Sequence, residues 1–236
     1  MSYIIWNGTD SRNIKGLLIC ELPPITKPQM RVKETIIDGV DGSIIEELGY
    51  ESYDKTIAVG LKIGADVDEI TEYFTGSGEV IFSNEPNRYY RAQIIKGIDY
   101  SRLLRYRVAK VTFRVQPFKY EYNEVEIYNN NPSGANEMTV TNVGNYFSKP
   151  LITITGSGKV ELSVNGTYVC DYTFVSNPIG AETVIIDSEK QDAYLGNELK
   201  NMNMNGGFPI FEKGISVLSW SGTVERISVK RYSRWL

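Results

Sequence analysis

Strict alternation of apolar and polar residues constrains the fold of this chain more than any other feature. In Lys55–Ile63, Val111–Val115 and Val160–Val164, an apolar side chain recurs at every second position. Successive side chains of a β-strand point to opposite faces, so this period of two predicts strands with one buried face. We therefore expect an all-β fold. In the first run the predicted buried face consists of Ile57, Val59, Leu61 and Ile63.

Two glycine-containing stretches in the second half of the chain indicate turns. Asn165-Gly166 lies between the strand that ends at Val164 and the run Tyr168–Tyr172. This dipeptide favours a two-residue hairpin because both turn positions need positive φ. Gly156–Lys159 (GSGK) has the composition of a phosphate loop but lacks its spacing and its following helix. We predict a tight β-turn between two strands there.

One short stretch, Asp66–Thr75, is expected to be helical. Asp66 is a suitable N-cap, and Glu69 lies three residues later, as in a capping box. Gly76 suits a left-handed stop. About three turns are too few for a stable isolated helix, so this one must pack on a sheet. Its predicted packing face consists of Val67, Ile70, Tyr73 and Phe74.

A turn-rich stretch, Asn129–Gly134 (NNNPSG), predicts a division of the chain into two domains. Asn, Pro, Ser and Gly favour turns for separate reasons, and together they indicate a loop or linker. The predicted domains are residues 1–130, which contain the helix, and residues 131–236. The second half has turn residues at short intervals, as in a β-sandwich or jelly roll.

The residue types present narrow the possible chemistry. The chain has no His and two Cys, which excludes Ser-His-Asp and Cys-His catalytic pairs, His-ligated metals and a four-thiolate zinc site. Carboxylates remain, but the adjacent Glu46 and Glu47 point to opposite faces of a strand. We predict no enzymatic activity, catalytic residue, metal site or cofactor. Cys20 and Cys170 lie in apolar runs and are expected to be buried thiols.

Neither a membrane span nor a secretory signal is expected. No apolar run approaches the ~18 residues that a membrane span requires. The first residues, MSYIIWNGTD, lack the basic and apolar regions of a signal peptide. We therefore expect synthesis in the cytoplasm and no membrane association.

Opposite charges are concentrated in two segments. Seven acids and no base lie in Glu34–Asp54, whereas nine bases and one acid lie in Arg88–Lys119, so the local charges are −7 and +8. Three interpretations are open: two solvated faces, nucleic-acid binding with tyrosine stacking, or contact between copies of the chain. For the last, the candidate interface residues are Asp38, Asp41, Glu46, Glu47, Arg102, Arg105 and Arg107.

The acidic segment has the pattern of a β-hairpin. Ile36-Ile37 and Ile44-Ile45 are short β-branched runs, and the stretch between them, DGVDGS, is rich in glycine and aspartate. One thin hairpin cannot bury all of these isoleucines itself. They need a partner surface, either on their own domain or on a neighbouring chain.

Sugar binding is the alternative function. A tryptophan ring on a β-sandwich can stack on a sugar, although tryptophans on strands more often belong to the core. The candidates for a carbohydrate-binding module in host adsorption are Trp6, Trp220, Trp235 and Tyr194.

Several stretches, taken in order, resemble the distal tail proteins (Dit) of long-tailed, non-contractile bacteriophages and related prophages. The resemblance spans nearly the whole chain. Its elements are the Asn7-Gly8 turn, Ile14–Leu17, the Asp-Gly-rich hairpin, the strand Thr56–Ile63 with the short helix, Phe82–Tyr90 (FSNEPNRYY), Val111–Tyr120 (VTFRVQPFKY), Asn142–Gly144 through Lys149-Pro150, Gly156–Gly158, Phe208–Gly214 and Leu218–Leu236.

This resemblance implies a fold and an assembly. The fold would be an N-terminal β-sandwich with a projecting β-hairpin, followed by a galectin-like C-terminal β-sandwich. Six copies would form a ring at the distal end of the tail tube of the virion, with a central channel through which DNA passes without specific binding. The implied partners are the major tail tube protein, the tail-tip hub protein and, in some phages, receptor-binding proteins.

The position of the acidic residues in such a ring stays open. They could meet the basic segment of a neighbouring copy and set the register of the contact. They could instead line the channel and repel DNA.

Overall fold

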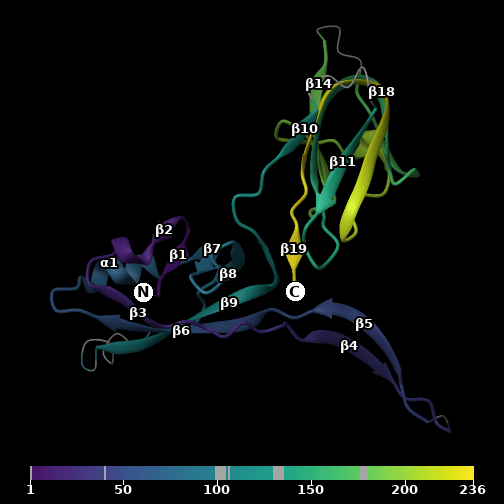
Figure 1. Ribbon diagram of the computed structural model, residues 1–236. Coiled ribbons are helices and arrows are strands. Elements are labelled where there is room, and N and C mark those ends of the chain that lie inside the picture. Colours follow the sequence, from purple (N-terminus) through teal and green to yellow (C-terminus); the bar gives the residue numbers. More distant parts are fainter. Residues whose placement is uncertain (1, 40, 99–104, 106, 130–135, 176–179) are drawn as a thin grey trace. The chain divides into compact units, whose positions relative to one another are not determined.

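The chain folds into two units that consist mainly of antiparallel strands (Figure 1). The computed structural model describes residues 2–39, 41–98, 105, 107–129, 136–175 and 180–236. One unit comprises Met1–Tyr122 with Leu236, and the other comprises Asn123–Trp235. The all-β class with a short helix is confirmed.

The boundary between the units lies earlier than the sequence predicts. It falls between Tyr122 and Asn123, whereas the turn-rich stretch indicated Asn129–Gly134. The reason is that strand β10 (Ile127–Asn129), which precedes this stretch, pairs with β18 (Gly214–Lys230) of the second unit. Residues 130–135 of the predicted linker lie outside the described residues.

The first unit contains one sheet with the strand order β2-β1-β7-β8-β9-β6-β3, and a separate pair, β4-β5. Its elements are β1 (Ile4–Trp6), β2 (Thr9–Asp10), η1 (Ser11–Asn13), β3 (Leu17–Glu21), β4 (Met30–Thr35), β5 (Ile44–Tyr50), β6 (Tyr53–Leu61), α1 (Val67–Tyr73), β7 (Ser77–Phe82), β8 (Arg88–Gln93) and β9 (Val108–Glu121).

Strand β9 joins the two parts of this sheet. Its residues Val108–Val115 pair with β6, and from Arg114 onward it pairs with β8. Both parts place alternate side chains in one core, because Ile57 and Val59 of β6, Val111 and Phe113 of β9 and Tyr90 of β8 are all buried. The alternation predicted for β9 is therefore confirmed.

The predicted helix is confirmed, although the strand before it ends two residues earlier than expected. The Asp66 carboxylate caps α1 by accepting from the backbone N–H groups of Asp68 and Glu69. Ile70, Tyr73 and Phe74 are buried, as the helical spacing predicted. Strand β6 ends at Leu61, and Ile63 is 95% exposed. The prediction that Ile63 is buried is wrong because the alternation continues past the last residue of the strand.

The second unit is built on two long strands, β12 and β18. Its elements are β10, β11 (Glu137–Asn142), β12 (Leu151–Val164), β13 (Thr167–Thr173), β14 (Glu182–Asp187), β15 (Asp192–Leu195), β16 (Glu198–Leu199), η3 (Asn201–Asn203), β17 (Met204–Gly206), β18 and β19 (Arg234–Trp235). The first half of β12 pairs with β14 and its second half with β13, and β18 likewise pairs with β11 and then with β10. Both halves of β12 place residues in one core, which gives a β-sandwich.

The GSGK stretch forms the bend of this sandwich. The prediction of a tight turn between two strands is wrong, because β12 continues through Gly156–Lys159 with shifts of its register to β18. A Cβ on Gly156 would lie 2.4 Å from the carbonyl oxygen of Thr223. Glycine therefore allows β12 and β18 to approach closely at the bend, where the register between the two strands shifts.

Replacement of Gly156 by alanine tests this close approach. We expect Gly156→Ala to lower the free energy of unfolding of the second unit by about 1–3 kcal/mol, because the added methyl group overlaps the Thr223 carbonyl. Gly207 lies in the same unit, and a Cβ there would meet only the Val169 carbonyl oxygen at 4.0 Å, so Gly207→Ala is the control, with an expected change below about 0.5 kcal/mol. Urea denaturation measures both, and equal stabilities would contradict the role of Gly156.

The predicted hairpin is confirmed. Asn165 and Gly166 have φ of 51° and 78° and join β12 to β13.

One of the two cysteine predictions is wrong. Cys170 is buried, and burial raises the pKa of its thiol to about 12. Cys20 is exposed because Leu17 and Ile19 of β3 take the buried positions and leave the next side chain on the outer face.

Candidate functional site

The candidate functional site is the β4–β5 hairpin with its supporting segment. We call Met30–Tyr50 the arm. Among the described residues its strands pair only with each other, and they project from the sheet of the first unit (Figure 1). The hairpin predicted around Ile36–Ile45 is thus confirmed as an independent two-stranded ribbon.

The arm exposes more apolar surface than such a ribbon can stabilise by itself. Isolated two-stranded hairpins are marginal in water, and contiguous exposed apolar surface usually indicates an interaction site. Six large apolar residues of the arm are between 45% and 75% exposed: Val32, Ile36, Ile37, Ile44, Ile45 and Leu48. The arm therefore needs a covering surface that its own chain does not provide among the described residues.

The four acidic candidates all lie exposed on the arm. Asp38 and Asp41 belong to the connection between β4 and β5, and Glu46 and Glu47 belong to β5. Glu46 forms an ion pair of 3.4 Å with Lys33 on the opposite strand. Glu47 has no ion pair within the described part of the chain.

The basic candidates are only partly described. Arg105 and Arg107 are exposed, and the backbone carbonyl of Arg107 accepts from the N–H of Leu61 at the end of β6. Arg102 lies outside the described residues.

The charge segregation is weaker in the fold than in the sequence. Asp54, counted with the acidic segment, contacts two members of the basic segment of its own chain. Its carboxylate lies 2.5 Å from Lys96 Nζ and 2.8 Å from Arg114 Nε. Those bases are therefore not available in full to another chain.

Side chains of the sheet hold the segment that leads into the arm. We call residues 22–29 the strap. Lys55 Nζ donates to the Pro24 carbonyl (2.9 Å), Asn84 Nδ2 to that of Pro23 (3.0 Å) and the Tyr53 hydroxyl to that of Thr26 (3.5 Å). Three side chains from β6 and the β7–β8 turn thus fix the direction in which the arm starts.

A buried charge cluster supports this anchorage. We call Lys55, Glu85 and Lys119 the charge cluster. Lys55 is 2% exposed, and its Nζ lies 4.9 Å from the centre of the Tyr90 ring. Glu85 accepts hydrogen bonds from Lys119 Nζ and from the Tyr90 hydroxyl. Glu85 lies in FSNEPNRYY, so the structure gives this stretch a role that the sequence alone did not reveal.

Burial shifts the pKa of Lys55 and of two tyrosines beside it. Desolvation lowers the pKa of Lys55 to about 8, Glu85 opposes this shift and Lys119 adds to it. Burial also raises the pKa of Tyr53 to about 12 and that of Tyr90 further.

The lowered pKa of Lys55 predicts a pH dependence of stability. Between pH 8 and pH 10 the unfolded chain keeps the Lys55 proton and the folded chain loses it, so the free energy of unfolding rises with pH. The expected rise is roughly 2 kcal/mol. The measurement compares urea denaturation of the unchanged chain and of Lys55→Met from pH 7 to 10. The difference between them should grow with pH, and a constant difference would contradict the shift.

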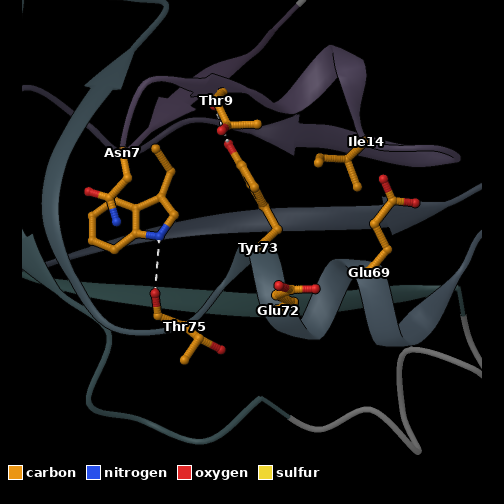
Figure 2. Close-up of a pocket in the computed structure, with 8 residues that line it drawn as sticks. Asn7, Thr9, Ile14, Glu69, Glu72, Tyr73 and Thr75 are labelled. Atoms are coloured by element: carbon orange, nitrogen blue, oxygen red, sulfur yellow. Dashed lines mark hydrogen bonds between the residues drawn. The ribbon is translucent and has the colours of Figure 1, made fainter.

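The cleft in Figure 2 lies between α1 and the first strands, with a volume of about 310 Å³. Its wall groups already bond to each other: Trp6 Nε1 donates to the Thr75 carbonyl (3.4 Å) and the Tyr73 hydroxyl to that of Thr9 (3.1 Å). Glu69 and Glu72 line it, but nothing in it converges on a bound molecule. We assign it no ligand.

The tryptophans proposed as sugar platforms are mostly part of the cores. Trp6 and Trp220 are 2% and 5% exposed, so neither can present a ring face to a sugar. The Tyr194 hydroxyl donates to Asp192, and Lys190 lies 5.6 Å from the centre of its ring. The stacking interpretation is therefore wrong for Trp6 and Trp220.

The described residues form neither a metal-binding cluster nor a membrane-spanning helix. Across the described ranges, no group of three or more His, Cys, Asp or Glu residues is placed to hold a metal ion. Nor does this part of the chain contain a helix with the length and apolarity to cross a membrane.

The fold and the site define a two-unit β protein with six exposed large apolar residues on a projecting hairpin. This is the fold of the SPP1 Dit protein (gp 19.1), with a TM-score of 0.69, 15% sequence identity and 100% of both chains covered. That protein is described as a paradigm of the hub adsorption apparatus in phages that infect Gram-positive bacteria.

Two further similarities are weaker. Two chains of the phage p2 baseplate in its activated conformation have TM-scores of 0.46 and 0.44, with 10% identity and coverage of 97% and 98% of each chain. No protein-family model and no curated protein sequence matches the chain.

Proposed function

We propose that this protein is a structural component of a bacteriophage tail tip, and that six copies form a ring at the distal end of the tail tube. The observation that carries the proposal is the arm, an exposed apolar and acidic ribbon on a fold shared with the SPP1 Dit protein. An arm that reaches from one copy to the next makes a head-to-tail contact, and such contacts close into rings when the rotation per copy allows it.

The rest of the proposed role follows from the place of such a ring in the virion. One face binds the major tail tube protein, and the other binds the tail-tip hub protein and, in some phages, receptor-binding proteins. DNA passes through the channel without specific binding. The role is non-enzymatic and needs no cofactor.

The oligomeric state tests this proposal directly. Light scattering of the purified chain at moderate salt should give about 160 kDa, six times the 26.6 kDa of one chain. Negative-stain images should show rings with an open centre. A strict monomer at high protein concentration would overturn the proposal.

A further inference from the structure

The two faces of the arm differ in charge. Residues directly opposite each other in an antiparallel pair share one face of the ribbon. Val32 lies opposite Glu47 and Glu34 opposite Ile45, whereas Lys33 lies opposite Glu46 and Thr35 opposite Ile44. We call the faces the acidic face (Val32, Glu34, Ile45, Glu47) and the neutral face (Lys33, Thr35, Ile44, Glu46).

On the neutral face the charges are already compensated. Lys33 and Glu46 pair at 3.4 Å, so this face carries no net charge. On the acidic face both glutamates are uncompensated: Glu34 accepts only from the Ser43 hydroxyl, and Glu47 has no ion pair among the residues the structure covers.

The acidic face also carries two exposed apolar side chains. Val32 and Ile45 are 48% and 62% exposed, and they alternate diagonally with the two glutamates. This alternation of apolar and acidic side chains complements a surface on which basic groups alternate with apolar atoms. Lys and Arg can cover apolar residues with their aliphatic stems and place their charged groups beside the carboxylates.

The beginning of β9 offers a surface of this kind. Arg107 and Lys110 are exposed, and Val108 between them is 46% exposed. Neither base has an ion pair in the described ranges. Lys110 is followed on the same face of β9 by Thr112 and Arg114, and Arg114 is already paired with Asp54. The uncompensated positive charge on this face therefore lies at the beginning of the strand.

We propose that the arm docks on a second copy of this chain through its acidic face, against Arg107, Val108 and Lys110 of that copy. Val32 and Ile45 then cover Val108 and the basic stems, and Glu34 and Glu47 meet the head groups. This inference rests on the proposed ring, and it adds which face of the arm makes the contact and where.

Charge reversal at the adjacent positions 46 and 47 tests the choice of face. Glu47→Lys places a base against bases, so the protein concentration at half-assembly should rise about tenfold or more. Adding Lys110→Glu to this variant should restore assembly. Glu46→Lys is the matched control on the neutral face and should assemble within about threefold of the unchanged chain. The readout is light scattering over a dilution series, with circular dichroism to confirm folding.

Cross-linking gives a second test that needs no loss of assembly. In a Cys20→Ser background, Ile45→Cys combined with Val108→Cys should form disulfide-linked chains on oxidation, and Ile44→Cys with Val108→Cys should not. Linking only from position 44, or disruption by Glu46→Lys alone, would overturn the acidic face as the contact. Unchanged assembly of Glu47→Lys without any linking would also overturn it and leave the ring intact, whereas a monomeric unchanged chain would overturn the proposed function itself.

Discussion

Glu85→Gln should lower the free energy of unfolding of the first unit by about 3 kcal/mol or more, because it removes the carboxylate that pairs with Lys119 and offsets the charge of the buried Lys55. The Glu85 and Lys119 side chains are 12% and 14% exposed, and Lys55 is 2% exposed. The amide keeps the shape of the carboxylate and removes its charge, so the variant isolates the electrostatic part of the contact.

A double substitution separates this effect from a general loss of packing. In Lys55→Met with Glu85→Gln, the most buried positive charge is absent, and at least half of the lost stability should return. Hydrogen exchange in increasing urea is the measurement, since peptides from β6, β8 and β9 report the first unit separately. Glu72→Gln on the exposed side of α1 is the control, with an expected change below about 0.5 kcal/mol. A Glu85→Gln variant as stable as this control would show that the cluster does not hold the first unit together.

The charge cluster shows what the sequence cannot predict. Alternation in β6 places Lys55 on the same face as Ile57 and Val59, yet nothing local explains why a lysine occupies this position. Its counter-charge, Glu85, lies 30 residues later on the β7–β8 turn. Lys119, which pairs with Glu85, lies 64 residues later on β9. Only the sheet order that brings β6, β9 and the β7–β8 turn together makes the lysine tolerable.

Features that depend on neighbouring residues were predicted well. The cap of α1 and the Asn165-Gly166 turn need only a few consecutive residues, and both are confirmed. Features that depend on distant pairing were not. The observed domain boundary precedes the predicted one because Ile127–Asn129 pairs with residues a hundred positions away. The GSGK stretch forms a bend within a strand and not a turn between two strands, because β18 runs beside it.

The candidate site was predicted in part. The hairpin and its exposed acids were visible in the sequence, but Glu46 and Glu47 were grouped as equivalent contacts. Their positions on opposite faces follow from the strand alone. The ion pair of Glu46 with Lys33 does not, because a shift of one residue in the β4–β5 register would place a different residue opposite the lysine.

Shortening the arm should abolish assembly and leave both units folded. Arg31 lies directly opposite Gly49 in the ribbon, so replacing residues 32–48 with Asn-Gly closes it with a two-residue turn. The change removes all six exposed apolar residues and all four acidic candidates of the arm. None of these apolar residues belongs to the core of the first unit. We expect association to weaken at least about a hundredfold, since the main covering contact between copies is lost.

The stability of the shortened chain decides how this result is interpreted. Strap contacts from Lys55, Asn84 and Tyr53 lie outside the deleted residues, so the urea midpoint of the monomeric variant should match that of the unchanged chain diluted below its assembly concentration. A folded monomer would assign ring formation to the arm. Rings formed by the shortened chain would place the contact elsewhere, because a ribbon that can be removed without effect cannot hold neighbouring copies together.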